Sequence, residues 1–230
     1  YFSEPLLVLL VLWFLTVNME LPEDYKKGSK FFLGAKIDLS KKPFIPREET
    51  EYWVSLAIKE IKESAVCLDL FSGSGCIGIA ILKNINNSYC DFGEKEEIFR
   101  DQIKINLELN NIEESRYSII ETEAFSNIEK QYDYILANPP YVALNRIKEV
   151  GEDVLEFEPH CALFSGNDGL DAIKEFLLKA RNYLKDNGVI YMEFDEKQLN
   201  EIENIVKINY SKYEFFKDQF NKYRFIRLEK

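Results

Sequence analysis

Short apolar runs alternate with amphipathic helical patterns over most of this sequence, and that alternation limits the folds available to it. The runs that read as buried strands lie at 66–71, 88–92, 117–121, 132–137 and 189–194. The helical patterns lie at 47–61, 77–83, 94–110, 170–184 and 199–208, and two last apolar runs follow at 213–216 and 225–228. A glycine after a helix commonly ends it, so Asn187-Gly188 predicts the end of the helix that starts at 170. Because strands that alternate with helices form a mostly parallel sheet with right-handed crossovers, we predict an α/β fold whose doubly wound sheet closes on an antiparallel strand pair.

The pattern divides the chain into a short N-terminal segment, residues 1–45, and one domain, residues 46–230. Residues 5–17 are apolar and uncharged, yet a membrane-spanning helix needs about 20 such residues. Secretory signals carry basic residues before the apolar run, and here Glu4 precedes it. Since the sequence begins with Tyr1 and Met19 is a candidate start, we interpret residues 1–18 first as a truncated or spurious leader, next as a buried helix and last as a membrane anchor.

The charge balance disfavours an extended nucleic-acid groove. The sequence has 29 Lys and Arg against 40 Asp and Glu, a net charge of −11, whereas such grooves carry a basic stripe. An acidic surface permits a basic protein partner. The cysteines include no Cys-x-x-Cys pair and His160 is the sole histidine, so we expect no metal site. Unpaired cysteines indicate a reducing, cytoplasmic compartment, and we expect a monomer that binds neither nucleic acid nor membrane directly.

A glycine-rich turn joins the first strand of the predicted sheet to the next helix, and it reads Asp69-Leu70-Phe71-Ser72-Gly73-Ser74-Gly75. Glycines let the backbone turn sharply and approach a ligand. Gly78 completes the G-x-G-x-x-G spacing, so a dinucleotide ligand stays open, whereas the absence of Gly-Lys-Ser/Thr excludes a Walker loop. A carboxylate inside an apolar strand must be paired or hydrogen-bonded. Asp69 is therefore predicted either to capture the amine of a cationic ligand or to cap the N–H groups of its own loop.

Two further acidic positions point to a nucleoside-containing ligand. Asp91 stands at the end of the second strand of the predicted sheet, about 20 positions past the glycines, where a carboxylate can accept both ribose hydroxyls. The alternative for Asp91 is a helix N-cap. After the next strand come Glu123 and Ala124, and the Glu123 carboxylate is a candidate acceptor for an adenine amino group.

The tetrapeptide Asn138-Pro139-Pro140-Tyr141 directly follows the 132–137 strand. Two consecutive prolines end a sheet ladder and stiffen the loop, and ligand crevices of open α/β sheets lie at the carboxyl ends of strands. A stiff loop that carries an amide and an aromatic ring suits a small planar polar group. The alternative is a plain strand-ending turn with a solvated Tyr141.

Together these segments resemble class I S-adenosylmethionine-dependent methyltransferases, among which amino-group methyltransferases carry the Asn-Pro-Pro-Tyr motif. Over residues 31–230 the chain resembles more narrowly the HemK/PrmC family, which methylates the glutamine side-chain amide of translation release factors. Residues 45–51 are similar to the family's I-P-R-P-E-T-E segment, and residues 157–170 to its F-E-P-x-x-A-L…G-x-D-G-L stretch. Residues 193–198 are similar to its E-x-G-x-x-Q end of a strand.

The resemblance implies a Rossmann-like class I methyltransferase fold, S-adenosyl-L-methionine as cofactor, and a peptide chain release factor as the protein substrate, methylated on a glutamine side-chain amide for translation termination. The implied catalytic residues are Asn138, Pro139, Pro140 and Tyr141. The implied cofactor-binding residues are Asp69, Phe71, Ser72, Gly73, Ser74, Gly75, Asp91, Glu123, Ala124 and Asn138.

The sequence also departs from the family pattern. Glu48 replaces a proline, Phe71 replaces a glycine, Phe194-Asp195 lacks the usual glycine, and extra residues lie between Asp91 and Gln102. The family's helical N-terminal domain, which helps dock the release factor, is expected to be absent. Two other functions stay open: an amino methyltransferase that acts on adenine N6 or guanine N2 of a flipped base, and a non-catalytic scaffold of the same fold.

Overall fold

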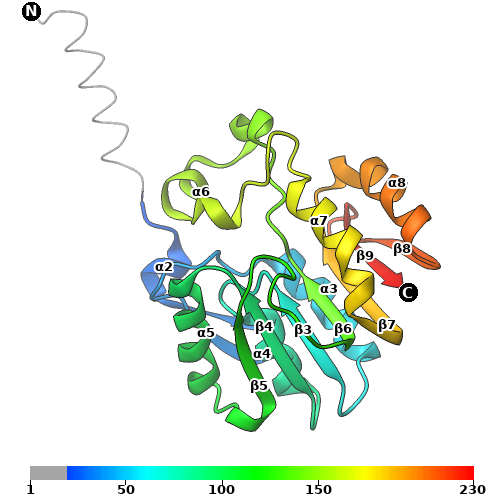
Figure 1. Ribbon diagram of the computed structural model, residues 1–230. Coiled ribbons are helices and arrows are strands. Elements are labelled where there is room, and N and C mark those ends of the chain that lie inside the picture. The colour runs from blue at the N-terminus through cyan, green and yellow to red at the C-terminus, as the bar shows by residue number, and fades with distance from the viewer. Residues whose placement is uncertain (1–19) are drawn as a thin grey trace, which may run out of the picture.

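The computed structural model describes residues 20–230, so the apolar stretch at 5–17 and the candidate start Met19 lie outside the described residues. The main strands are β3 (Val66–Leu70), β4 (Tyr89–Glu94), β5 (Tyr117–Glu121), β6 (Tyr132–Ala137), β7 (Leu184–Glu193), β8 (Lys212–Lys217) and β9 (Tyr223–Glu229). They form one sheet in the order β5-β4-β3-β6-β7-β9-β8 (Figure 1). The strands from β5 across to β7 pair in parallel, and β9 is antiparallel to both of its neighbours. The predicted fold class, with its antiparallel terminal strand pair, is confirmed.

Helices cover both faces of the sheet. α3 (Glu48–Glu60), α4 (Cys76–Asn84) and α5 (Glu97–Leu109) pack on one face, and α7 (Asp171–Lys179) and α8 (Leu199–Asn209) pack on the other. The remaining elements are α2 (Glu23–Lys27), β1 (Ser29–Phe32), β2 (Ala35–Asp38), α6 (Glu152–Phe157) and the short 3₁₀ turns η1 (Glu114–Arg116), η2 (Leu144–Glu149), η3 (His160–Ala162), η4 (Ala180–Tyr183) and η5 (Glu196–Gln198).

The two cores follow from the two-residue period of the strands. In β6, Tyr134 and Leu136 belong to the core beneath α3, α4 and α5, while Ile135 and Ala137 belong to the core beneath α7 and α8. Because both faces are covered, the central strands carry apolar residues on both faces, interrupted in β3 and β4 by Asp69 and Asp91, which is why they read as nearly continuous apolar runs in the sequence.

The hairpin of β1 and β2 packs against α5 and shares the core of the domain. Asn106 Oδ1 accepts from Asp38 N at 2.7 Å, and Asn110 Oδ1 accepts from Lys36 N at 3.0 Å. The two helix amides thus satisfy the free edge of the hairpin, while the domain boundary at residues 45 and 46 stays a prediction. Within residues 20–230, no helix is both long and apolar enough to cross a membrane.

The prediction that Asn187-Gly188 ends a helix is wrong. α7 ends at Lys179, a 3₁₀ turn continues to Tyr183, and Gly188 lies inside β7, where the register against β6 shifts. A Cβ on Gly188 would lie 2.8 Å from Cδ2 of Leu184 and 3.0 Å from the carbonyl oxygens of Lys185 and Tyr132. The glycine therefore serves a close approach of β7 to its own irregular start and to β6, which a local C-cap pattern does not reveal.

Gly78 supplies a test of the packing between α4 and the sheet. A Cβ at this position would lie 2.3 Å from Cε1 of Phe92 and 2.9 Å from Sγ of Cys90, both fully buried. We expect Gly78→Ala to lower the free energy of unfolding by about 1–3 kcal/mol, because overpacking outweighs the better helix propensity of alanine. Lys83→Ala, at an exposed position of the same helix, should change it by no more than about 0.5 kcal/mol. Urea unfolding of both variants measures this, and an unchanged or raised stability of Gly78→Ala would contradict it.

Candidate active site

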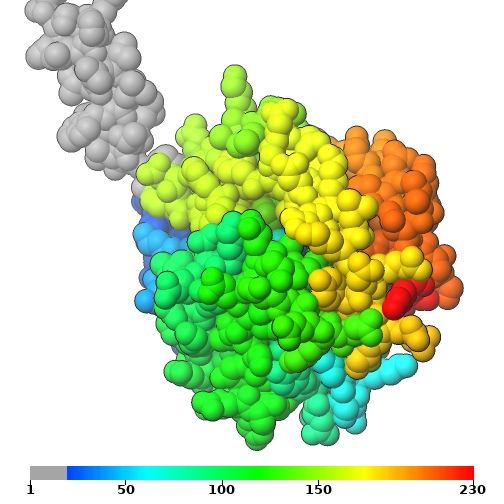
Figure 2. Space-filling model, viewed as in Figure 1, coloured from blue at the N-terminus to red at the C-terminus, as the bar shows by residue number. Residues whose placement is uncertain are grey.

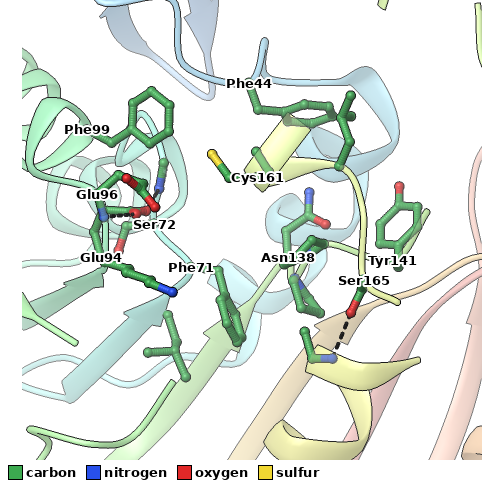
Figure 3. Close-up of a pocket in the computed structure, with 18 of the residues that line it drawn as sticks. Phe44, Phe71, Ser72, Glu94, Glu96, Phe99, Asn138, Tyr141, Cys161 and Ser165 are labelled. Atoms are coloured by element: carbon green, nitrogen blue, oxygen red, sulfur yellow. Dashed lines mark hydrogen bonds between the residues drawn. The ribbon is translucent and has the colours of Figure 1, made fainter. Parts of the chain in front are cut away.

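A cavity of about 510 Å³ opens where the parallel strands end (Figure 3). Its wall comes from the loops after four strands, at residues 70–74, 93–96, 122–124 and 138–142. α4 leaves β3 toward one face of the sheet, while the chain after β6 reaches α7 on the other face. Loops that diverge in this way leave a crevice between neighbouring strands, the usual ligand position in such sheets.

The segment between β6 and α7 covers the cavity. It contains η2, α6 and η3, stands above the sheet in Figure 1, and its yellow-green surface meets that of α5 in Figure 2. Glu158, 5% exposed, accepts a hydrogen bond from Ile45 N at 3.1 Å and forms an ion pair with Arg47. One buried carboxylate therefore joins the 157–170 stretch to the 45–51 stretch.

At Gly73 the glycine loop presents its backbone to the cavity without a side chain. Gly73 has a φ of +53°, a Cβ built on it would meet nothing within 4 Å, and it lines the cavity. Ser72 and Ser74 line it as well. Gly75, with a φ of +77°, faces the helices instead, since its Cβ would lie 3.2 Å from Ile103.

Asp69 lies beneath this loop and does not line the cavity. It is fully buried, its Oδ2 accepts from Gly78 N at 2.9 Å, and its Oδ1 is a buried atom without a hydrogen-bond partner. Of the two roles predicted for Asp69, the structure shows the cap on N–H groups of its own turn. The other predicted role, contact with a ligand amine, stays a prediction.

Phe71 occupies the position at which the resembled family has glycine. Its φ is +60°, in the left-handed region that costs a non-glycine residue about 1–2 kcal/mol. Its ring lines the cavity and lies 6.3 Å from the ring of Phe176. Figure 3 shows Phe44, Phe71 and Phe99 around the same open space, so aromatic surface is available to a flat ligand group.

The placement of Asp91 at the end of its strand is wrong. β4 continues for three more residues to Glu94, and Asp91 is fully buried, bonded to Lys130 at 3.0 Å and to the Tyr132 hydroxyl at 2.8 Å. Glu94 instead lines the cavity, where its Oε2 accepts from Gly73 N at 2.8 Å. Burial raises the pKa of the Glu94 carboxyl, and the hydrogen bonds from Glu96 N, Gly73 N and Lys95 N oppose the rise. The missed signal was the acidic residue directly after Gly93, one position before the chain turns toward α5.

The loop after β5 contributes Thr122, Glu123 and Ala124 to the cavity wall. The Glu123 side chain is 68% exposed and forms an ion pair with Lys95 at 2.7 Å. Thr122 is buried and donates from its hydroxyl to the carbonyl oxygen of Ala124 at 2.9 Å, which shapes the turn. The loop thus lies at the rim, where its contacts to a ligand stay predicted.

All four residues of the Asn138-Pro139-Pro140-Tyr141 loop line the cavity. Gln198 holds the loop, since its Nε2 donates to the carbonyl oxygens of Tyr141 at 3.0 Å and Gly169 at 2.9 Å. A Cβ on Gly169 would lie 2.3 Å from the Tyr141 carbonyl oxygen, so only glycine fits there. The Tyr141 hydroxyl donates to Glu193 at 2.9 Å, which rules out the alternative of a freely solvated side chain. The loop is therefore clamped from two sides.

Sequence reasoning missed the buried polar group behind this loop. Glu193 is 1% exposed and accepts from Thr50, Trp53 and Tyr141. The signal was present, because Thr50 and Glu193 stand inside the stretches 45–51 and 193–198 that carry the family resemblance. What the sequence did not show is that the two stretches meet.

Fold and site together define a class I, Rossmann-like methyltransferase domain. Residues 54–159 match the family model described as "Methyltransferase small domain". A crystal structure of a methyltransferase from Pyrococcus furiosus has the same fold, with a TM-score of 0.61, 20% identity and coverage of 85% of this chain and 89% of that one.

Named relatives indicate which family of methyltransferases this domain belongs to. A release factor glutamine methyltransferase of Flavobacterium psychrophilum is 31% identical, over 93% of this chain and 77% of its own length. Another, of Streptococcus pneumoniae, is 34% identical, over 77% of this chain and 63% of its own length. The chain belongs to the family of release factor glutamine methyltransferases. It spans less than two thirds of the length of the first relatives it matches.

The buried Asp69 carboxyl makes stability depend on pH. Burial raises its pKa well above the usual range; the hydrogen bond from Gly78 N opposes this and the charge of Glu94 adds to it. Because the pKa is higher in the folded state, its contribution to the stability is complete below about pH 4, the pKa of an unfolded aspartate, and is lost as pH rises to the raised pKa. Asp69→Asn keeps an acceptor for Gly78 N–H but does not titrate.

We therefore expect the stability of the parent relative to Asp69→Asn to fall from pH 5 toward pH 8, by about 1.4 kcal/mol per unit of pH as long as the pH is below the raised pKa, because the folded state there holds a proton that the unfolded chain has released. Urea unfolding of both proteins at the two pH values measures this difference. A difference that does not change with pH would contradict a raised pKa of Asp69 in the folded state.

Proposed function

We propose that this chain transfers a methyl group from S-adenosylmethionine to the side-chain amide nitrogen of a glutamine in a peptide chain release factor. The observation that carries the proposal is that the clamped Asn138-Pro139-Pro140-Tyr141 loop lines one cavity with the Gly73 loop after β3 and with Glu94 at the end of β4. The names of the relatives support the choice of substrate, and the four free cysteines fit a cytoplasmic site of action.

The residues of the cavity fit the cofactor. The open space beside Gly73 admits a ligand against the backbone, and Glu94 presents a carboxylate where ribose hydroxyls would donate. The rings of Phe71 and Phe99 offer flat apolar surface to an adenine. When bound, S-adenosylmethionine supplies an electrophilic methyl group on a sulfonium.

The loop after β6 then prepares the acceptor. A primary amide nitrogen is a weak nucleophile because its lone pair is delocalised into the carbonyl group. In the proposed arrangement the Asn138 side-chain oxygen and the Pro139 carbonyl oxygen accept the two N–H bonds of the target amide, beside the ring of Tyr141. Two acceptors orient the nitrogen and stabilise the positive charge that develops on it, a gain from positioning and electrostatics. No general base is needed, since the proton can leave after the transfer.

Two alternatives are less well supported. An exocyclic amine of a flipped base would present similar geometry to Asn138, but the named relatives act on release factors, and the net charge of −11 offers no basic stripe for nucleic acid. A non-catalytic scaffold would not require a lined cavity with a clamped amide. Transfer of tritiated methyl groups, with a bacterial release factor in one reaction and RNA or DNA in another, separates the three functions.

Asn138→Ala tests the proposed acceptor site. We expect the rate of methyl transfer to a release factor to fall by at least about 100-fold, because one of two oriented acceptors is lost. The Kd for S-adenosylmethionine, measured by calorimetry, should stay within about threefold, an effect below 1 kcal/mol. Full activity of this variant would refute the proposed role of the loop.

Glu94 and Asp91 form a matched pair of acidic residues on one strand. Glu94→Gln should weaken S-adenosylmethionine binding about 10- to 100-fold, because hydrogen bonds to a charged acceptor are worth about 1.5–3 kcal/mol. Asp91→Asn should leave the Kd within about threefold while lowering the free energy of unfolding, since its partners are Lys130 and Tyr132. Calorimetry measures the Kd for S-adenosylmethionine in both variants. A larger loss of affinity in Asp91→Asn than in Glu94→Gln would assign cofactor binding to Asp91 instead of Glu94.

A further inference from the structure

We infer that Thr50, which is hydrogen-bonded to Glu193 beside Trp53, fixes the orientation of the Asn138 side-chain amide so that its oxygen faces the cavity. This orientation makes the site select an NH₂ group over a carboxylate. Resting on the proposed function for its substrate, this inference assigns Thr50 a positioning role that acts through Asn138. Thr50, Trp53 and Glu193 come from the two ends of the domain; Thr50 lines the cavity, while Trp53 and Glu193 do not.

The contacts form one chain of hydrogen bonds. Glu193 Oε2 accepts from Trp53 Nε1 at 2.7 Å and from Thr50 Oγ1 at 2.7 Å. Thr50 Oγ1 in turn lies 3.4 Å from Asn138 Nδ2. Thr50, Trp53 and Glu193 are each at most 2% exposed, so water does not compete for these groups.

The direction of each bond follows from the chemistry of the donors. An indole N–H only donates, so Oε2 of Glu193 must accept from Trp53. An ionised carboxylate oxygen only accepts, so Oε2 also accepts from Thr50, whose single hydroxyl proton is used in that bond. Thr50 Oγ1 keeps only lone pairs for its other neighbour, and it can pair with the NH₂ end of Asn138 but not with the oxygen end.

The remaining end of the amide is left for the substrate. Asn138 lines the cavity (Figure 3), and among residues 20–230 its Oδ1 accepts no hydrogen bond. An acceptor matches the NH₂ of a glutamine side chain. A reversed Asn138 would offer N–H donors instead, and these match the oxygens of a glutamate.

This order belongs to the ionised carboxylate of Glu193, whose two oxygens only accept. Burial raises the pKa of its carboxyl, and the hydrogen bonds from Thr50, Trp53 and Tyr141 together with the charge of Arg224 oppose the rise. A proton on Oε1 would leave the order unchanged, because Oε2 would still accept from Trp53 and Thr50, whereas a proton on Oε2 would donate to Thr50 and reverse it.

The test uses three variants of the full chain, each with one substitution in α3. Thr50→Val keeps the shape but removes the hydroxyl, Thr50→Ser restores it, and Ser55→Ala removes a hydroxyl that bonds only to the Tyr52 carbonyl oxygen. The readouts are kcat and KM with a release factor, and the Kd of that factor and of its variant with glutamate at the methylated position. S-adenosylmethionine binding and thermal unfolding are followed in parallel.

We expect Thr50→Val to lower kcat about 10- to 50-fold and to reduce the preference for glutamine over glutamate at least about fivefold, because the Asn138 amide can then rotate. Thr50→Ser should restore both quantities to within about threefold of the parent, and Ser55→Ala should equal the parent. A purely structural role would weaken both ligands equally in Thr50→Val. An unchanged preference in that variant would overturn the inference.

A readout without substrate separates this inference from the proposed function. In ¹H–¹⁵N spectra, the side-chain NH₂ resonances of Asn138, assigned by their loss in Asn138→Asp, should move upfield and exchange faster in Thr50→Val but not in Thr50→Ser. Resonances that do not respond to Thr50→Val overturn the inference. If the parent methylates no release factor, the proposed function fails, while these spectra still decide whether Thr50 orients Asn138.

Discussion

The buried carboxylate of Glu193 connects the parts of the chain on which the site depends. A carboxylate away from water is costly unless donors surround it, and here the donors are Thr50, Trp53 and Tyr141. α3 precedes the sheet, Tyr141 follows β6, and Glu193 ends β7, so a single 1% exposed residue fixes the mutual position of three elements. Removing any one donor would leave a charge partly uncompensated, which makes the arrangement specific as well as stable.

Parallel strand order explains why the other site residues meet. β4, β3 and β6 are neighbours in the sheet, so the glycine loop, Glu94 and the Asn138 loop share the same edge although 65 residues separate Gly73 from Asn138. The covering segment is tied down by Glu158 and Arg47 in the same way that the Asn138 loop is tied by Glu193. Both ties use a buried carboxylate and a donor from the 45–51 stretch. Residues 45–51 thus support both the Asn138 loop, through Thr50 and Glu193, and the segment that covers the cavity, through Arg47 and Glu158.

Much of the fold could be predicted because its signals are local. The bounds of β5 and β6 match the predicted runs, since apolar residues there are bordered by polar turns. Errors arose where a contact outweighed a local preference. Gly188 reads as a helix cap but serves a close approach of β7 to Tyr132, and Asp91 reads as a strand end although β4 continues to Glu94. For Asp69 both roles were compatible with the sequence; the structure shows the hydrogen bond from Gly78 N, and contact with a ligand amine stays a prediction.

By itself the sequence determined the order of strands and helices, the glycine loop at 69–75 and the stiff Asn138-Pro139-Pro140-Tyr141 loop, because periodicity, glycine and proline act over a few residues. It also contained the segments that carry the family resemblance. Only the tertiary structure decided that Glu94 and not Asp91 lines the cavity, and that Thr50 lies between Glu193 and Asn138. The reason is physical: strand register and the direction of a hydrogen bond depend on partners that are distant in the chain, and no local pattern encodes them.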